Sequence, residues 1–359
     1  MTPLASELVS WIKQTGPMTI AQFMALCLGH PTHGYYTRRD PLGVAGDFTT
    51  APEISQMFGE LIGLCLAESW THQGRPPRFT LAELGPGRGT LMADILRVTR
   101  KVPGFHEALR VCLVEISPAL RAAQSERLGA FSPMWLDTVA GLERIDEPLY
   151  LVANEYFDVL PIRQFARSAE GWRERVIALS DEGELAFALS PPSAPAELAH
   201  RLADTSEGDL VEWRAQAVSD GQTIAGLIEQ RGGAALIIDY GDWRSRGDTL
   251  QAIAEHAYCD PLQRPGNADL TAHVEFESLA RAADAAGARH SSMVPQGTFL
   301  KRLGIDIRAQ VLAQALAGKD LESHLAASRR LTAPEEMGTL FKAMAFYPRD
   351  ASPPPGFSE

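Results

Sequence analysis

The chain has 359 residues, a length that fits two ordinary domains or one large domain with insertions. Hydrophobic residues make up 45% of it and charged residues 22%, which excludes collagenous, wholly disordered and disulfide-framework proteins. With 45 acidic and 33 basic side chains the formal net charge is −12, and no run of Lys and Arg is dense enough for a phosphate-binding face, so nucleic acid is excluded as the expected partner.

The cysteines and the apolar runs bear on the compartment. The cysteines show neither a C-x-x-C pair nor metal-ligand spacing, which predicts reduced, mostly buried thiols and no metal site. They are Cys27, Cys65, Cys112 and Cys259. Glu7 and Lys13 interrupt what would be the apolar stretch of a signal peptide, and no apolar run approaches the ~18 residues that cross a bilayer. We therefore expect no membrane insertion, and a location in the bacterial cytoplasm, or in the mitochondrial matrix if the chain is eukaryotic.

The first part of the chain, residues 1–77, is predicted to form a helical cap and a covering loop. Two amphipathic helices are expected around a break at Gly16-Pro17. The segment 33–55 is rich in Gly, Pro and Thr but also carries paired tyrosines, which favours an ordered functional loop over a linker. We expect this loop to close over a ligand as a lid.

From residue 78 onward predicted strands and helices alternate, which is typical of a parallel sheet with helices on both faces. The sequence therefore predicts an α/β fold with a doubly wound, Rossmann-like sheet. Its strands are expected at 78–84, 109–116, 133–137, 149–154 and 234–241. The domain boundaries expected are a core of 78–165 and 232–347, an inserted accessory α+β lobe of 166–231, and a flexible tail of 348–359.

A Gly-rich segment follows the first predicted strand. Gly85, Gly87 and Gly89 stand at alternate positions, which permits a tight turn and lets a ligand approach bare backbone at the start of a helix. The dinucleotide fingerprint G-x-G-x-x-G would need its third glycine where Thr90 stands. Glu83, two residues before the first glycine, would repel a pyrophosphate but suits a ligand with an ammonium group. The pattern E-x-G-x-G-x-G resembles the first motif of doubly wound methyltransferases that use S-adenosylmethionine; a structural loop without ligand is the alternative.

Three further polar residues stand at the predicted ends of strands. Glu115 ends the second strand, 30 residues after Gly85, where a carboxylate accepts both ribose hydroxyls of an adenosine. Asp137 ends the third strand, where it would accept from the adenine amino group, or it is an ordinary turn acid. Asn154 ends the fourth strand and is expected beside the cofactor, because ligands of open α/β sheets bind at the carboxyl ends of the strands.

Two acids after the fourth strand are candidates for the acceptor site. Glu155 and Asp158 are three residues apart with Tyr156 and Phe157 between them. Paired carboxylates with aromatic rings suit a planar cation such as guanidinium, which takes bidentate acceptors and a π-face. The alternative is that these acids cap the following turn. His273 is a candidate acceptor of the proton released by the substrate, or a structural histidine.

Several longer strings extend this interpretation to nearly the whole chain. They are "HGYYTRRDPLGVAGDFTTAPEISQMFGELIG", "LAELGPGRGTLMADIL", "VEISPALRAAQ", "VANEYFDVLPIRQF" and "DLTAHVEF". Together they resemble the MidA-like family of class I methyltransferases, which contains the mitochondrial arginine methyltransferase that assists complex I assembly. The resemblance runs from about Ile20 to Tyr347, and one departure is Pro295, where a Thr is expected.

The resemblance implies an S-adenosyl-L-methionine cofactor and symmetric dimethylation of an arginine on a protein, a complex I subunit or its bacterial equivalent. It maps the three glycines and Glu115 to the cofactor site, and Asp47, Phe48 and Thr49 to the covering loop. Two alternatives stay open: a methyltransferase for another class of substrate, and an assembly chaperone that binds the cofactor without turnover. A nicotinamide dehydrogenase is disfavoured by the glycine spacing and by Glu83.

Overall fold

The computed structural model describes residues 2–38 and 50–357, and the chain forms two compact units. The larger unit comprises residues 49–157, 218–243 and 276–359, and the smaller comprises 1–48, 158–217 and 244–275. This division differs from the predicted ranges. The long helix α5 (Gln56–His72), predicted within the N-terminal cap, belongs to the larger unit because its apolar residues pack into the same core as helix α6 (Thr90–Thr99).

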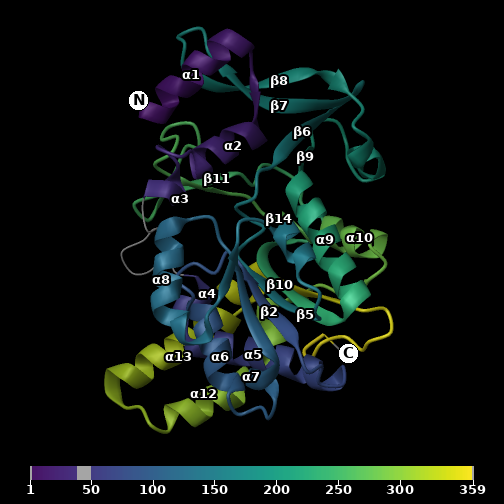
Figure 1. The fold of residues 1–359 in the computed structure, drawn as a ribbon. Helices are drawn as coiled ribbons and strands as arrows, with labels where there is room; N and C mark the ends of the chain where they lie inside the picture. The colour runs from purple at the N-terminus through teal and green to yellow at the C-terminus, as the bar shows by residue number, and fades with distance from the viewer. Residues whose placement is uncertain (1, 39–49, 358–359) are drawn as a thin grey trace. The chain divides into compact units, whose positions relative to one another are not determined.

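The larger unit is a sheet with helices on its two faces (Figure 1). Its strands are β2 (Phe79–Leu84), β3 (Leu109–Val114), β4 (Met134–Leu136), β5 (Leu149–Asn154), β10 (Gly233–Asp242), β15 (Arg289–His290), β16 (Val294–Pro295) and β17 (Phe341–Tyr347). Its remaining helices are α4 (Ala51–Ile54), α7 (Phe105–Ala108), α8 (Pro118–Leu128), η1 (Gly129–Phe131), η2 (Val139–Arg144), α9 (Ala215–Arg231), whose first three residues count with the smaller unit, α10 (Phe276–Ala285), α11 (Gln296–Arg302), α12 (Ile305–Ala313), α13 (Gly318–Thr332) and α14 (Met337–Leu340).

The strand order of this sheet confirms the doubly wound prediction. The strands run β15-β17-β10-β5-β2-β3-β4, and β2, β3, β4, β5 and β10 pair in parallel while β17 is antiparallel to β10. The chain leaves β2 toward β3 and β4, then returns to place β5 on the other side of β2. This reversal is a topological switch point, and in open α/β sheets ligands bind there, outside the carboxyl ends of the strands.

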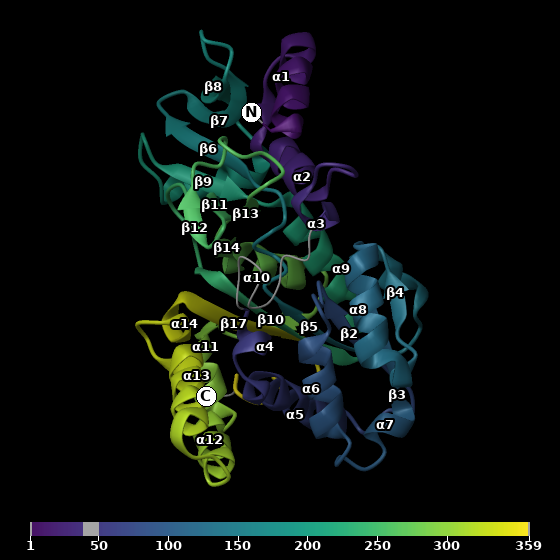
Figure 2. The same ribbon diagram turned by 90° about the vertical axis from the view of Figure 1, so that its left-hand side faces the viewer.

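The interior of the larger unit explains why the central strands are almost entirely apolar. Strands β2 and β5 are buried along their whole length, as expected for strands covered on both faces. Figure 2 shows α9 and α10 on the opposite side of the sheet from α5 and α6. On the α5 and α6 side, Leu81, Val152 and Leu236 from three neighbouring strands share one core with those helices.

The C-terminal segment differs from the prediction that residues 348–359 would fray. Phe357 is 6% exposed and stacks on Phe299 with ring centroids 4.7 Å apart. The carbonyl of Pro355 accepts from the Cys65 thiol at 3.3 Å. The aromatic residue near the end of the tail supplies enough apolar area to hold the segment, up to residue 357, against the core.

The smaller unit combines two N-terminal helices with two antiparallel sheets. Its helices are α1 (Pro3–Thr15), α2 (Ile20–Gly29), α3 (Tyr35–Arg38) and η3 (Ala196–Ala203), and its strands are β1 (Met18–Thr19), β6 (Arg163–Ser168), β7 (Gly171–Leu179), β8 (Leu185–Ser193), β9 (Leu210–Trp213), β11 (Gln251–Ala254), β12 (Ala257–Cys259), β13 (Asp269–Thr271) and β14 (Val274–Glu275). One sheet has the order β1-β7-β6-β9 with β8 beside β7, and the other has the order β12-β11-β13. The two N-terminal helices and the strands of the accessory lobe were both predicted.

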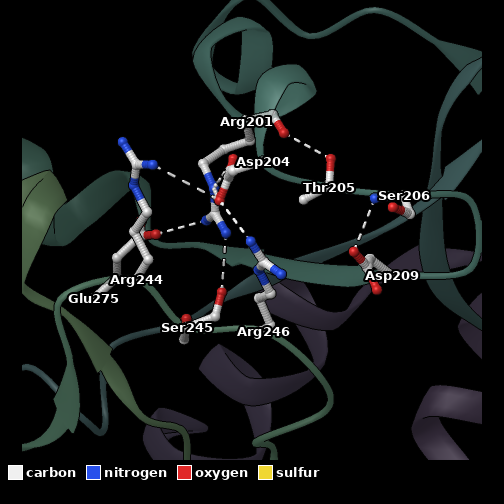
Figure 3. Close-up of polar contacts among 9 residues, drawn as sticks. All are labelled: Arg201, Asp204, Thr205, Ser206, Asp209, Arg244, Ser245, Arg246 and Glu275. Carbon is white, nitrogen blue, oxygen red and sulfur yellow. Dashed lines mark hydrogen bonds and ion pairs between the residues drawn. The ribbon is translucent and has the colours of Figure 1, made fainter.

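A buried arginine stabilises the smaller unit (Figure 3). The side chain of Arg201 is 1% exposed and forms ion pairs with Glu275 at 2.6 Å and with Asp204 at 3.2 Å. It also donates to the backbone carbonyl of Ser245 at 3.2 Å. Arg201 therefore joins η3 to two segments that lie more than 40 residues further along the chain.

Two further features of the fold concern the cysteines and the helices. All four cysteines are free; Cys259 is partly exposed and the other three are buried. Within residues 2–38 and 50–357, none of the helices combines the length and the apolar character that a bilayer-spanning helix needs.

Candidate cofactor and acceptor site

The Gly-rich turn joins β2 to α6 at the switch point. Gly85, Gly87 and Gly89 all adopt left-handed backbone angles, with φ of +57°, +52° and +75°. Residues with a Cβ rarely adopt this region, so the turn requires glycine. A Cβ at Gly89 would lie 3.1 Å from the side chain of Leu128, and one at Gly85 would lie 3.3 Å from the ring of Tyr156. A side chain at Gly85 or Gly89 would therefore crowd its neighbours, which adds to the need for glycine at both positions.

Glu83, the second-to-last residue of β2, is 3% exposed. Its carboxylate accepts from the backbone N–H of Met92 in the first turn of α6, and burial raises the pKa of Glu83 well above its usual value. Its Oε2 has no hydrogen-bond partner among the described residues. A buried carboxylate oxygen without a donor fits a ligand that brings its own N–H groups.

Glu115 follows β3 at the same edge of the sheet, as predicted. Its Oε1 accepts from the backbone N–H of Ser117 at 2.7 Å, and its Oε2 lies 3.4 Å from Nε2 of Gln124. Burial raises its pKa although these hydrogen bonds oppose the rise. The hydrogen bonds fix the carboxylate at the carboxyl end of β3, the position from which an acid reaches ribose hydroxyls.

Gln124 is a site residue that sequence reasoning missed. It is fully buried on α8 and its Nε2 donates to the carbonyl of Gly87 at 2.7 Å, while Trp135 donates to its Oε1 at 2.8 Å. Gln124 therefore links the Gly-rich turn to Glu115. A lone Gln in a predicted amphipathic helix carries no pattern that would have identified it.

Asp137, predicted near adenine, lies just beyond β4. Its side chain is 80% exposed and forms an ion pair with Arg121 at 2.6 Å. Arg121 also donates through Nε to the backbone carbonyl of Glu115 at 2.7 Å. Asp137 and Glu115 are thus connected through one arginine, and a contact of Asp137 with adenine stays a prediction.

Asn154 and Glu155 stand at the carboxyl end of β5, next to β2. Asn154 is 8% exposed, and its Nδ2 donates to Oε1 of Glu155 at 3.0 Å. The same Oε1 accepts from the backbone N–H of Ala51 at 3.2 Å. Glu155 has a φ of +51°, a strained angle for a residue with a side chain. Strain of this kind is concentrated at functional sites.

Helix α4 connects the end of the covering segment to the Gly-rich turn. Thr90, the first residue of α6, donates its hydroxyl to Glu53 of α4 at 2.5 Å. Arg127 of α8 also donates to this hydroxyl. The predicted covering residues Asp47, Phe48 and Thr49 lie outside the described residues, so a closing lid stays a prediction.

Tyr156 and Phe157 are held by two acids that the sequence did not indicate. The Tyr156 hydroxyl donates to Asp220 at 3.0 Å, and the backbone N–H of Phe157 donates to Asp239 at 3.0 Å. Both acids are buried, at 8% and 0% exposed. These contacts fix the backbone that follows β5 and keep the Tyr156 ring against Gly85.

Asp158 and His273, the other predicted acceptor residues, belong to the smaller unit, whereas Glu155 belongs to the larger. Asp158 is 5% exposed, and its charge helps to raise the pKa of Tyr36, after burial and Asp269. The guanidinium of Arg214 donates to the backbone carbonyls of Asp158 and His273, both at 3.2 Å. Arg214 therefore brings these two segments together, while the Glu155 and Asp158 clamp stays a prediction.

The switch point, the Gly-rich turn and the acid after β3 define a class I fold for an adenosine-bearing cofactor. The donor set fits S-adenosyl-L-methionine: left-handed glycines that bare the backbone, and a buried acceptor oxygen of Glu83 for an ammonium group. Residues 61–294 match a protein-family model described as that of an S-adenosyl-L-methionine-dependent methyltransferase. The chain belongs to this family, and it is an S-adenosyl-L-methionine-dependent methyltransferase.

Curated relatives and solved structures agree with this assignment. The chain is 37% identical to the rat protein named "Protein arginine methyltransferase NDUFAF7, mitochondrial", over 97% of this chain and 85% of the relative. The human protein of the same name is also 37% identical, over 97% of this chain and 84% of the relative. A Burkholderia thailandensis protein solved with S-adenosyl-homocysteine bound has 31% identity and a TM-score of 0.84, covering 98% of this chain and 93% of that one.

Proposed function

We propose that this methyltransferase symmetrically dimethylates an arginine side chain of a protein. The proposed substrate is a complex I subunit or its bacterial equivalent. The observation that carries the proposal is the 37% identity, over 97% of the chain, to relatives named as protein arginine methyltransferases. Those relatives are named as mitochondrial, which supports a mitochondrial location, proposed as the matrix, if this chain is eukaryotic. For a bacterial chain the cytoplasm stays a prediction.

The cofactor half of the site belongs to the larger unit. We assign the methionine part of the cofactor to the Gly-rich turn and Glu83, the ribose to Glu115, and the neighbourhood of adenine to Asp137. When bound, the cofactor supplies an electrophilic methyl group on a sulfonium. The protein contributes chiefly by orienting the acceptor and excluding water, which together account for a large part of catalysis in such displacements.

On the acceptor side, Glu155 and Asp158 are the proposed carboxylates for the guanidinium. Carboxylates hold a planar guanidinium through paired hydrogen bonds, and a lysine ammonium offers no matching fork. His273 is proposed as the group that takes up the released proton, and the half-buried position of this residue allows exchange with solvent.

Methyl transfer to proteins of an extract tests the proposal. Purified protein and S-adenosyl-L-methionine with a tritiated methyl group are added to an extract of cells that lack the gene, and the labelled proteins are hydrolysed for amino-acid analysis. We expect labelled symmetric dimethylarginine. Label in methyllysine, in another methylated residue or in a small molecule would assign a different substrate class, and tight cofactor binding without label would favour the assembly chaperone.

A further inference from the structure

The side-chain amide of Asn154 has an oxygen without a partner. Asn154 is 8% exposed, and its Oδ1 accepts no hydrogen bond from any of the residues that the structure describes. Most buried side-chain oxygens in proteins are hydrogen-bonded, so an exception needs a physical reason. The place of Asn154 in the fold favours a ligand that supplies the donor.

Asn154 ends β5, the strand beside β2 at the switch point. Glu83 of β2 pairs with Val152 of β5, and Asn154 follows two residues later. Side chains of residues two apart in a strand point to the same face of the sheet, as do those of paired residues on neighbouring strands. Asn154 and Glu83 therefore project from one face of the sheet. The Oε2 of Glu83 also lacks a partner among the described residues. Two buried oxygens that need donors therefore stand at one edge of two neighbouring strands.

The neighbouring Glu155 fixes which way the amide faces. An ionised carboxylate only accepts hydrogen bonds, so the amide nitrogen and not the oxygen must face Oε1 of Glu155, 3.0 Å away. Glu155 is itself held by its backbone N–H, which donates to the Ile238 carbonyl at 3.0 Å, and by the Ala51 N–H on its carboxylate. Glu155 thus acts on Asn154 as a positioning residue, and Oδ1 faces away from Glu155.

We propose that Oδ1 of Asn154 accepts a hydrogen bond from the nitrogen that becomes methylated. The proposal rests on the proposed transfer to a nitrogen of arginine. The choice between cofactor and acceptor follows from charge: the carboxylate of Glu83 matches the permanent charge of the cofactor ammonium group, whereas a neutral amide oxygen binds an N–H without holding it as a cation. The nitrogen must have an available electron pair to react.

The reaction gives this hydrogen bond a larger effect on rate than on binding. The nitrogen forms a bond to the methyl carbon as the bond from that carbon to sulfur breaks, and the sulfur keeps the electron pair of the broken bond. The nitrogen gains positive charge and then releases one proton, which the proposed function assigns to His273. A fixed carbonyl dipole aimed at this nitrogen stabilises the transition state more than the bound substrate. Asn154 therefore raises kcat with little effect on KM.

Asn154→Ala tests the proposal with two measurements: the Kd of S-adenosyl-homocysteine by calorimetry, and the rate of methylarginine formation in the extract assay at saturating cofactor. We expect the Kd to stay within about twofold and the rate to fall at least about tenfold. The matched control is Asn267→Ala, which removes an amide from a turn of the smaller unit and should change neither value.

Two results would overturn the proposal. A Kd raised about tenfold with an unchanged rate at saturation would place the amide on the cofactor, and unchanged values for both would make it structural.

If the alanine variant fails to fold, Asn154→Asp keeps the shape but puts a carboxyl group against Glu155. We then expect activity to recover as the pH falls and the two carboxyl groups share a proton, and a flat profile would contradict us. If the wild type labels a residue other than arginine, the proposed function fails, and the Asn154 comparison is then made on that product.

Discussion

The two compact units of this chain differ in how directly the sequence encodes them. In the larger unit the proposed cofactor site follows from one strand, one turn and one helix that are consecutive, from Glu83 to Thr90, with Glu115 directly after the next strand. In the smaller unit the buried side chain of Arg201 contacts residues far apart in the chain, Ser245 and Glu275. A local motif can be predicted from the sequence, whereas a network of residues far apart in the chain is identified only from the structure.

The largest effect is expected from Arg201→Met in the smaller unit. Removing the buried guanidinium leaves Glu275 and Asp204 without their main counter-ion, which should lower the free energy of unfolding by about 3–5 kcal/mol. Urea unfolding measures this change. Arg329→Met is the matched control, because the Arg329 pair with Glu335 is 66% and 60% exposed and should contribute less than about 1 kcal/mol. Equal losses in the free energy of unfolding for the two variants would contradict a stabilising role of the ion pairs of Arg201.

Gly87→Val should abolish cofactor binding. A branched residue at a φ of +52° is strained and would stand where the ligand approaches the backbone, so we expect the Kd of S-adenosyl-homocysteine to rise by at least about 100-fold, or 2.7 kcal/mol. Gly183→Val imposes a similar strain at a φ of +80° in an open turn of the smaller unit and should leave the Kd unchanged. Calorimetry on both folded variants makes the comparison. Similar Kd values for both would contradict binding of the cofactor at the Gly-rich turn.

Glu115→Gln should weaken cofactor binding by about 1–3 kcal/mol, because it removes the proposed charge-assisted hydrogen bonds to the ribose and retains the shape. Glu143→Gln, at an exposed position of the same unit, is the control. A change of less than about twofold for Glu115→Gln in calorimetry would show that this buried acid has a structural role and binds no ligand.

The smallest effect expected is a pH dependence of binding that comes from Glu83. Burial raises the pKa of this carboxyl group, so it is neutral over a pH range in which an ordinary Glu is ionised. A cationic ammonium group requires the ionised form. Affinity for S-adenosyl-homocysteine should therefore increase as the pH rises through the raised pKa, by at most about tenfold per pH unit, and protons should be released on binding. Glu83→Gln should remove this dependence, and an unchanged slope would assign it to another group.

The sequence predicted the sheet, its parallel strands and the Gly-rich turn because each depends on local patterns of apolar residues and glycines. It did not indicate Gln124, Asp220 or Asp239, since a single polar residue within a helix or strand has no local signature before its partner is known. The predicted flexible tail was wrong for Phe357, which is buried by a contact with Phe299 from a helix more than 50 residues earlier.

Hydrogen–deuterium exchange with and without S-adenosyl-homocysteine tests most directly whether the cofactor binds at the carboxyl ends of β2, β3 and β5. We expect the ligand to slow amide exchange in three segments at the carboxyl ends of β2, β3 and β5, namely residues 85–92, 115–124 and 154–157. Strands β6, β7 and β8 of the smaller unit should exchange at unchanged rates. Slower exchange in those strands, with no change at the Gly-rich turn, would contradict the assignment of the cofactor to this edge of the sheet.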